Sequence, residues 1–256
     1  MSRKPIANPL LDVDGEFDPV NLINPYSFAV AGGSFDPLSI SGCVLWLKAD
    51  GDVYNTGTTQ ATDGQTVETW ADMSGNGRNA VYFAGTKPVF QTNEVNGKPV
   101  VEGGASWGGL VFSLPTLTAG TLFWVGKHLC TNTCDVHEIG GSALGDPRTY
   151  YPHYGSASMT FGTNTRKTFT EPSGAKTDWQ AISISANTSW KCWVNGSNKL
   201  DTSNTFSAPS TTDSRIMWNT QAQFAEFILY NSALGTTDRE DVEDYLGTKY
   251  GVTITH

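Results

Sequence analysis

The sequence predicts an all-β protein, a sandwich of two antiparallel sheets with one short helix near the C-terminus. Short runs of strand-forming residues follow one another from about residue 41. Turn signals such as Gly75-Asn76-Gly77 and Asn195-Gly196 separate these runs, and only one stretch has a convincing helical period. The 256 residues include 27 glycines, which suits a fold with many turns.

The expected strands are short and regularly spaced. They are Val44–Leu47, Val67–Trp70, Ala80–Phe83, Val100–Glu102, Gly109–Phe112, Thr121–Val125, Val136–Ile139, Ser158–Phe161, Ala181–Ser185, Lys191–Val194 and Phe224–Tyr230. Asn195-Gly196 is the clearest hairpin turn, because both residues tolerate positive φ. The alternation before this turn places Cys192 and Val194 on one face of their strand.

The last expected strand leads directly into the helix. Its residues are apolar except Glu226, which we expect at a polar-facing position. Thr237 stands three residues before Glu240, which is the spacing of a capping box at a helix start. Gly251 can adopt the left-handed conformation that ends a helix. The strand and the helix are therefore expected to form one unit.

Four passages, in order, resemble the laminin-G-like, concanavalin A-like jelly-roll family. They are CVLWLKADG at 43–51, VETWADMSGNGRNA at 67–80, DWQAISIS with SWKCWVNG within 178–196, and AEFILYNSAL with DREDVEDYLGTKYG within 225–251. The resemblance implies a jelly-roll domain over residues 41–256. It implies no particular function, because this fold serves lectins, glycanases and structural modules.

Residues 1–40 differ from the rest of the chain. Prolines at irregular intervals favour an extended conformation, and apolar residues between them are too frequent for a solvated linker. We therefore expect an extended N-terminal arm that either wraps its own domain or docks on another subunit. The prolines are Pro5, Pro9, Pro19, Pro25 and Pro37.

The charge of the chain restricts its partners. The net charge is −9 with no basic cluster, which argues against nucleic acid and against an anionic membrane. No apolar run reaches membrane-spanning length. The N-terminus has no apolar stretch behind its positive charges, so we expect a protein that folds in a cytoplasm.

Two cysteines lie close together, at Cys130 and Cys134, and leave three interpretations open. A small-loop disulfide or a pair of reduced thiols is favoured. A zinc site with the flanking His128 and His137 is the less favoured alternative. The other two cysteines lie in strand-like runs, where a thiol behaves as a small buried hydrophobe.

Asp72, Ser74 and Asn76 have the oxygen spacing of the first half of a calcium loop. A full loop of that type needs a bidentate glutamate at its twelfth position, where this chain has Phe83. Asn and Asp also build such turns without metal, by bonding to their own backbone. A structural turn is therefore favoured over a calcium site, and no other cofactor is expected.

The sequence shows no sign of catalysis. A glycanase of this fold needs two or three carboxylates on one strand face. Asp135 and Glu138 come nearest to this pattern, but strict alternation would place them on opposite faces. No nucleophile motif is present. We therefore expect a protein that is not an enzyme.

Aromatic side chains give the best candidates for ligand binding. Four aromatic side chains cluster around Pro152, and one tryptophan lies among glycines. Aromatic rings on loops can stack on sugars or anchor a protein interface. The candidates are Tyr150, Tyr151, His153, Tyr154 and Trp107.

These features together favour a non-enzymatic virion protein that is assembled in a host cytoplasm. A capsid decoration, head fibre or tail appendage would use the arm to contact other virion proteins or sister subunits, in the latter case as a homo-oligomer. The NPYSFA stretch at 24–29 resembles arms of phage proteins. The jelly roll would then attach to host-surface glycans. The alternatives are an extracellular carbohydrate-binding module cut from a secreted protein, and a glycanase of the same fold.

Overall fold

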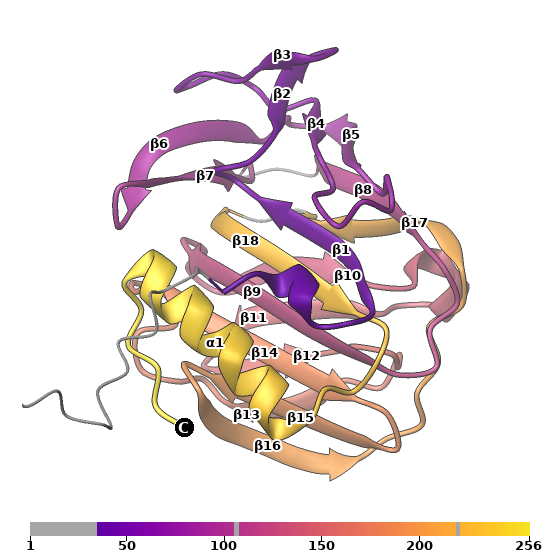
Figure 1. Cartoon of the computed structure of the whole chain (residues 1–256). Helices are drawn as coiled ribbons and strands as arrows, with labels where there is room; N and C mark the ends of the chain where they lie inside the picture. The colour runs from indigo at the N-terminus through magenta and orange to yellow at the C-terminus, as the bar shows by residue number, and fades with distance from the viewer. Residues whose placement is uncertain (1–34, 105–107, 219–220) are drawn as a thin grey trace, which may run out of the picture. The chain divides into compact units, whose positions relative to one another are not determined.

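A computed structural model describes residues 35–104, 108–218 and 221–256, which form two antiparallel sheets and one α-helix (Figure 1). Sheet A contains, in spatial order, β16 (Ser197–Ser203), β15 (Ser189–Val194), β14 (Gln180–Ala186), β9 (Gly120–His128), β18 (Ala222–Tyr230), β7 (Lys98–Glu102) and β6 (Val89–Val95), with β1 (Cys43–Lys48) also paired to β18. Sheet B contains β13 (Lys167–Thr170), β12 (Ser156–Met159), β11 (Arg148–His153), β10 (Thr133–Glu138), β17 (Thr211–Ile216), β8 (Gly108–Leu114), β5 (Ala80–Gly85), β4 (Thr69–Trp70), β2 (Val53–Thr56) and β3 (Thr59–Gln60). The predicted fold class is confirmed.

The main core lies between the two sheets, where large side chains alternate inward along the strands. It includes Trp124 of sheet A and Trp70 of sheet B, neither of which is exposed. In β15 the buried positions alternate as predicted, so Cys192 and Val194 both face this core. The hairpin after β15 is also confirmed, because Asn195 has a φ of 52°.

The helix α1 (Thr236–Tyr250) packs on the other face of sheet A. Its apolar side chains Val242 and Leu246 meet Phe123 and Ile228 of the sheet in a second cluster. The central strands of sheet A are therefore buried on both faces: all seven residues of β14 and all nine residues of β18 are buried. This is why β18 has an almost continuous apolar sequence rather than an alternating one.

The expected polar-facing position of Glu226 is wrong. Glu226 is 0 % exposed and lies between β18 and α1. Its carboxylate accepts hydrogen bonds from Trp46 Nε1 at 2.5 Å, Tyr250 OH at 2.7 Å, Lys249 Nζ at 2.8 Å and Tyr245 OH at 3.0 Å. The helix covers this side of the sheet, so Glu226 is shielded from water, and three of its four donors come from the helix.

The expected capping box is also wrong, while the predicted helix end is confirmed. The cap residue is Gly235, and no side chain bonds there. Thr237 already lies within the first helical turn, so its hydroxyl is not at the cap position. Gly251 ends the helix with a φ of 68° and donates its amide hydrogen to the Gly247 carbonyl. Within the described residues, no helix has the length and apolarity needed to cross a bilayer.

The compact unit begins at Phe35, six residues before the predicted domain boundary. Two contacts hold this beginning: the Phe35 ring lies 5.7 Å from that of Tyr245, and Tyr230 OH donates to the Pro37 carbonyl at 2.8 Å. A single turn of 3₁₀-helix spans Pro37–Ser39, and another spans Gly141–Leu144. The other 34 residues of the predicted arm lie outside the described residues.

Two histidines are fully buried in the main core and behave as aromatic rings. His128 makes an edge contact with Tyr151 at 5.0 Å, and His137 makes one with Trp124 at 5.4 Å. None of their ring nitrogens has a hydrogen-bond partner among the described residues. Burial lowers the pKa of each histidine from 6.5 to about 3, so both are neutral in the folded protein at pH 7.

Acid should destabilise the fold through these histidines. The unfolded chain binds their protons below about pH 6.5 and the folded protein does not, so each histidine lowers the free energy of unfolding by up to about 1.4 kcal/mol per pH unit between pH 6.5 and 3. A His128→Phe, His137→Phe variant keeps the ring contacts, and its free energy of unfolding should lose the histidines' contribution to the pH dependence. Chemical denaturation of parent and variant between pH 4 and 7 checks it. Equal slopes in the two proteins would contradict the prediction.

Candidate ligand-binding site

The outer face of sheet B, which points away from the main core, carries three of the five aromatic candidates for ligand binding. On β11, Arg148 and Tyr150 point outward, while Tyr151, the next residue of the same strand, points into the main core. On β10, Asp135 pairs with Tyr150 and Glu138 pairs with Arg148. The neighbouring strands thus place aromatic and charged side chains next to one another.

Asp135 and Glu138 lie on the same face, so their expected placement on opposite faces is wrong. The register of β10 against β11 shifts between Asp135 and His137, which marks a β-bulge. The extra residue allows both Val136 and His137 to face the core. Strict alternation therefore fails here, and both carboxylates point outward towards arginines.

Each of these carboxylates is largely buried and lies beside an arginine. Both residues are 4 % exposed. Burial raises the pKa of Asp135 to about 8, although Arg148, whose Nε lies 3.9 Å from Asp135 Oδ2, opposes the shift. Burial also raises the pKa of Glu138, opposed by Arg215, whose guanidinium donates to Glu138 Oε2 at 3.1 Å. Burial thus favours the protonated form of the Asp135 carboxyl.

Three of the predicted aromatic residues form a cluster at the end of β11, which we call the aromatic cluster: Tyr150, His153 and Tyr154. The ring of His153 stacks on Tyr150 with centroids 5.1 Å apart and meets Tyr154 edge-on, also at 5.1 Å. The Arg166 guanidinium lies 4.8 Å from the Tyr150 ring centroid. Tyr154 is 73 % exposed, so its ring is open to a ligand.

The residues around Tyr154 form a tight hairpin turn rather than the expected loop. Tyr154 and Gly155 connect β11 to β12, with φ values of 47° and 83°. Positive φ at both turn positions is typical of a type I′ hairpin turn. The turn projects Tyr154 beyond the end of the two strands.

Tyr151 does not belong to the aromatic cluster. It is 0 % exposed, and its hydroxyl donates to Gln180 Oε1 of β14 across the core at 2.5 Å. The prediction that Tyr151 binds ligand is therefore wrong, because neighbouring strand positions alternate between the two faces. Trp107, the other aromatic candidate, lies outside the described residues.

Polar and charged side chains continue across the outer face of sheet B. Asp146 pairs with Arg148 and with Arg166, and its Oδ2 lies 2.6 Å from the Arg166 guanidinium. The guanidinium of Arg215 lies over the rings of Trp218 and Phe83. A hollow of about 560 Å³ opens further along β8 and β17, lined by Ser113, Leu114, Ser142, Ser210, Thr211, Thr212 and Asp213.

The predicted calcium ligands lie elsewhere, in the turn after β4. Asp72 Oδ1 accepts from the amides of Trp46 and Ser74, at 3.0 and 2.9 Å, and Oδ2 accepts from the Ser74 hydroxyl and the Arg78 amide. Asn76 donates its side-chain amide to the Cys43 carbonyl at 3.1 Å. These bonds hold the turn against β1. They fit the structural turn that the sequence favours, and they do not test the less favoured calcium site.

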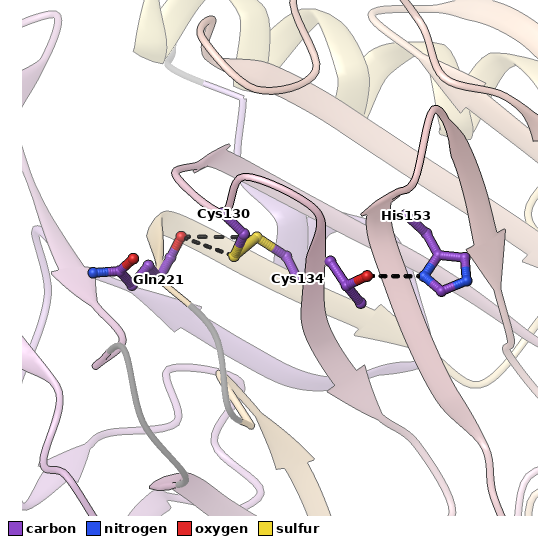
Figure 2. Close-up of a disulfide and its surroundings, with 5 residues drawn as sticks. Cys130, Cys134, His153 and Gln221 are labelled. Carbon is purple, nitrogen blue, oxygen red and sulfur yellow. Dashed lines mark hydrogen bonds between the residues drawn. A yellow bond between two sulfur atoms is a disulfide. The ribbon is translucent and has the colours of Figure 1, made fainter.

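The cysteine pair forms a disulfide. Cys130 and Cys134 are joined with their Cα atoms 5.6 Å apart, and both sulfurs lie near the carbonyl oxygen of Gln221 (Figure 2). Of the three interpretations, the small-loop disulfide is the one found. Within the described ranges, no three His, Cys, Asp or Glu side chains cluster as a metal site.

The sequence interpretation missed Arg148, Arg166 and Asp146. Only Arg148 has a local signal in the sequence: it stands two positions before Tyr150, and residues two apart in a strand share a face. Arg166 follows Tyr150 by sixteen residues and reaches it only because the chain turns back through β12. No sequence pattern indicates that contact.

Comparisons with known proteins were made by sequence and by structure. No family model matches the sequence, and no curated protein matches it significantly. Similar solved structures include the binding domain of botulinum neurotoxin serotype D, with a TM-score of 0.56 at 12 % identity over 79 % of this chain. The receptor-binding domain of botulinum neurotoxin type G has a TM-score of 0.56 at 14 % identity over 80 % of this chain. The sialidase of Trypanosoma rangeli has a TM-score of 0.53 at 13 % identity over 82 %.

These likenesses show the fold alone, a jelly-roll β-sandwich. This chain spans about half the length of the two toxin domains, 51 % and 52 %, and 33 % of the sialidase. At such low identity, no residue role carries over from those proteins to this one.

Substitutions of Tyr151 and Tyr154 should show that the first residue belongs to the core and the second to the surface. Tyr151→Ala removes a buried ring and leaves Gln180 Oε1 without its donor, so it should lower the free energy of unfolding by about 3–5 kcal/mol. Tyr154→Ala, the matched surface change, should alter it by less than about 0.5 kcal/mol. Chemical denaturation of both variants checks this. Similar losses for the two would contradict the assigned faces.

Proposed function

We propose that this chain is a non-enzymatic jelly-roll module that binds a glycan at the aromatic cluster on the outer face of sheet B. The observation that carries the proposal is the ring of Tyr154, which is 73 % exposed and lies at a two-residue hairpin turn beside His153. An exposed aromatic face stacks on the apolar face of a sugar ring, and nearby polar groups bond to its hydroxyls. The similar toxin domains are named as binding or receptor-binding domains, which supports a binding role.

The charges of this face favour an uncharged oligosaccharide. Arg148 and Arg166 are both paired with Asp146, and Arg215 is paired with Glu138 and Asp213. Paired arginines have fewer donors left for an anionic ligand, and the chain as a whole has a net charge of −9. Guanidinium and carboxylate groups side by side can instead donate to and accept from neutral sugar hydroxyls.

A glycan array with the parent protein and two variants tests the proposal. Neutral oligosaccharides should bind, and Tyr154→Ala should weaken binding by roughly 1–3 kcal/mol, about 5- to 150-fold. Thr168→Ala is the matched control, an exposed residue on edge strand β13 of the same sheet, and should bind normally. Failure of the parent protein to bind any sugar, or undiminished binding by Tyr154→Ala, would contradict the proposal.

Hydrolysis is the second candidate function, favoured by the shared face of Asp135 and Glu138. A glycoside hydrolase requires two carboxyl groups flanking the scissile bond, of which the general acid has a raised pKa, and burial raises the pKa of both carboxyls here. Both are only 4 % exposed and face arginines, so binding without turnover remains our proposal. Release of reducing ends from the bound sugars, abolished by Asp135→Asn or Glu138→Gln, would establish an enzyme instead.

We also propose that the module is displayed on a virion, with residues 1–34 attaching it to other virion proteins or to sister subunits. The support is the proline-spaced apolar sequence of that segment. The Cys130–Cys134 disulfide supports exposure to oxidising surroundings after assembly in a cytoplasm. An extracellular carbohydrate-binding module is the alternative that the disulfide supports equally.

Deleting residues 1–34 tests the attachment. The compact unit begins at Phe35, so the shortened protein should still unfold cooperatively and bind the same sugars. It should no longer co-sediment with particles produced in its presence. A shortened protein that still enters particles would remove the support for the attaching role, and glycan binding without any particle association of the full chain would favour the extracellular module.

A further inference from the structure

The disulfide closes a five-residue ring, Cys130 to Cys134, between the end of β9 and the start of β10. The β9 side is anchored to the residue before β18, because the Leu129 amide donates to the Gln221 carbonyl at 2.8 Å. Both sulfurs lie against the same carbonyl oxygen, as the dashed lines in Figure 2 show. The ring is therefore fixed to sheet A at one end and continues into sheet B at the other.

Two residues of this ring hold two residues of the aromatic cluster. Thr133 Oγ1 lies 3.1 Å from His153 Nδ1, and the two residues are strand partners. The amide of Tyr154 donates to the Asn132 carbonyl at 2.8 Å. His153 in turn stacks on Tyr150. The position of the most exposed ring of the cluster thus depends on contacts with the cyclic segment.

Tyr154 has particular need of such support. Its φ of 47° lies in the left-handed region, which disfavours residues with a Cβ. A residue in this conformation persists only where its surroundings hold it. The bond from its amide to Asn132 is one of the contacts that do so, and Asn132 lies within the ring.

We propose that the Cys130–Cys134 disulfide positions Tyr154 and His153 for binding, so that reduction of the disulfide weakens ligand binding without unfolding the domain; this rests on the proposed glycan-binding function. Opening the ring frees residues 131–133 from a cyclic constraint and lets the Asn132 carbonyl and Thr133 hydroxyl move. The turn at Tyr154 then loses both of its fixed partners. The rest of the sandwich keeps its two clusters of buried side chains.

The redox step requires a small thiol such as glutathione. Its thiolate attacks Cys130 Sγ, because Cys130 is half-buried and Cys134 is fully buried. Cys134 leaves as a thiolate and takes up a proton. A second glutathione thiolate then attacks the glutathione sulfur of the mixed disulfide, which yields glutathione disulfide and the Cys130 thiol. Two electrons pass from the two glutathiones to the cysteine pair, and the reverse exchange with glutathione disulfide restores the ring.

The other two cysteines do not compete in this exchange. Cys192 is fully buried, and its Sγ lies in the main core beside Met159. Burial raises the pKa of Cys43 to about 12, so its thiol stays protonated and unreactive at neutral pH. The chain therefore has a single cysteine pair that responds to its surroundings, with binding favoured once the protein leaves a reducing cytoplasm.

Amide hydrogen exchange of the full chain, oxidised and in excess dithiothreitol, tests the positioning directly. The Tyr154 amide should exchange about tenfold faster or more after reduction, because its bond to Asn132 is weakened. The amide of Ile184 in β14 reports opening of the whole fold and should not change. A Cys130→Ser, Cys134→Ser variant should match the reduced protein, and Cys43→Ser, which leaves the ring intact, should match the oxidised one.

The glycan array read with both redox forms tests the effect on binding. The oxidised protein should bind neutral oligosaccharides about tenfold more tightly than the reduced protein or the double serine variant. Equal Tyr154 exchange in the two forms, or equal sugar binding by both, would overturn the proposal. If neither form binds any sugar, the proposed function fails, while the Tyr154 exchange ratio still decides whether the disulfide positions this turn.

Discussion

Glu226 carries a carboxylate with no exposed surface at the junction of β1, β18 and α1. An isolated buried charge is costly, and here three neutral or aromatic donors and the Lys249 ammonium satisfy it. Lys249 also reaches Asp50 at 2.9 Å, which ties the helix to the segment after β1. The geometry of these bonds fixes where along the sheet the helix can lie.

The position of the helix decides which face of the molecule is available for binding. With α1 on sheet A, the central strands β14 and β18 of that sheet are buried on both sides. Sheet B instead presents exposed rings and paired charges on its outer face, from Phe83 on β5 to Tyr154 at the β11–β12 turn. The face that we propose for binding is thus the one that the helix leaves uncovered.

Irregularities of sheet B then shape the site on that face. A bulge in β10 turns Asp135 and Glu138 to the same side, and a register shift in β11 places His153 over Tyr150. The disulfide ring supports the same end of the two strands. Bulges and a left-handed tyrosine are local departures from ideal geometry, and such departures often occur at functional sites.

The sequence by itself determined the fold class, the single C-terminal helix and its end at Gly251, because strand periodicity, turn chemistry and a glycine stop are local properties. It also located all three residues of the aromatic cluster, which are three of the four aromatic candidates around Pro152. Only the tertiary structure decided that Glu226 is buried and Tyr151 belongs to the core, since burial depends on the layer that packs opposite. The same holds for Asp135, Glu138 and Arg166, because a bulge and a returning strand bring them together and neither leaves a periodic signal in the chain.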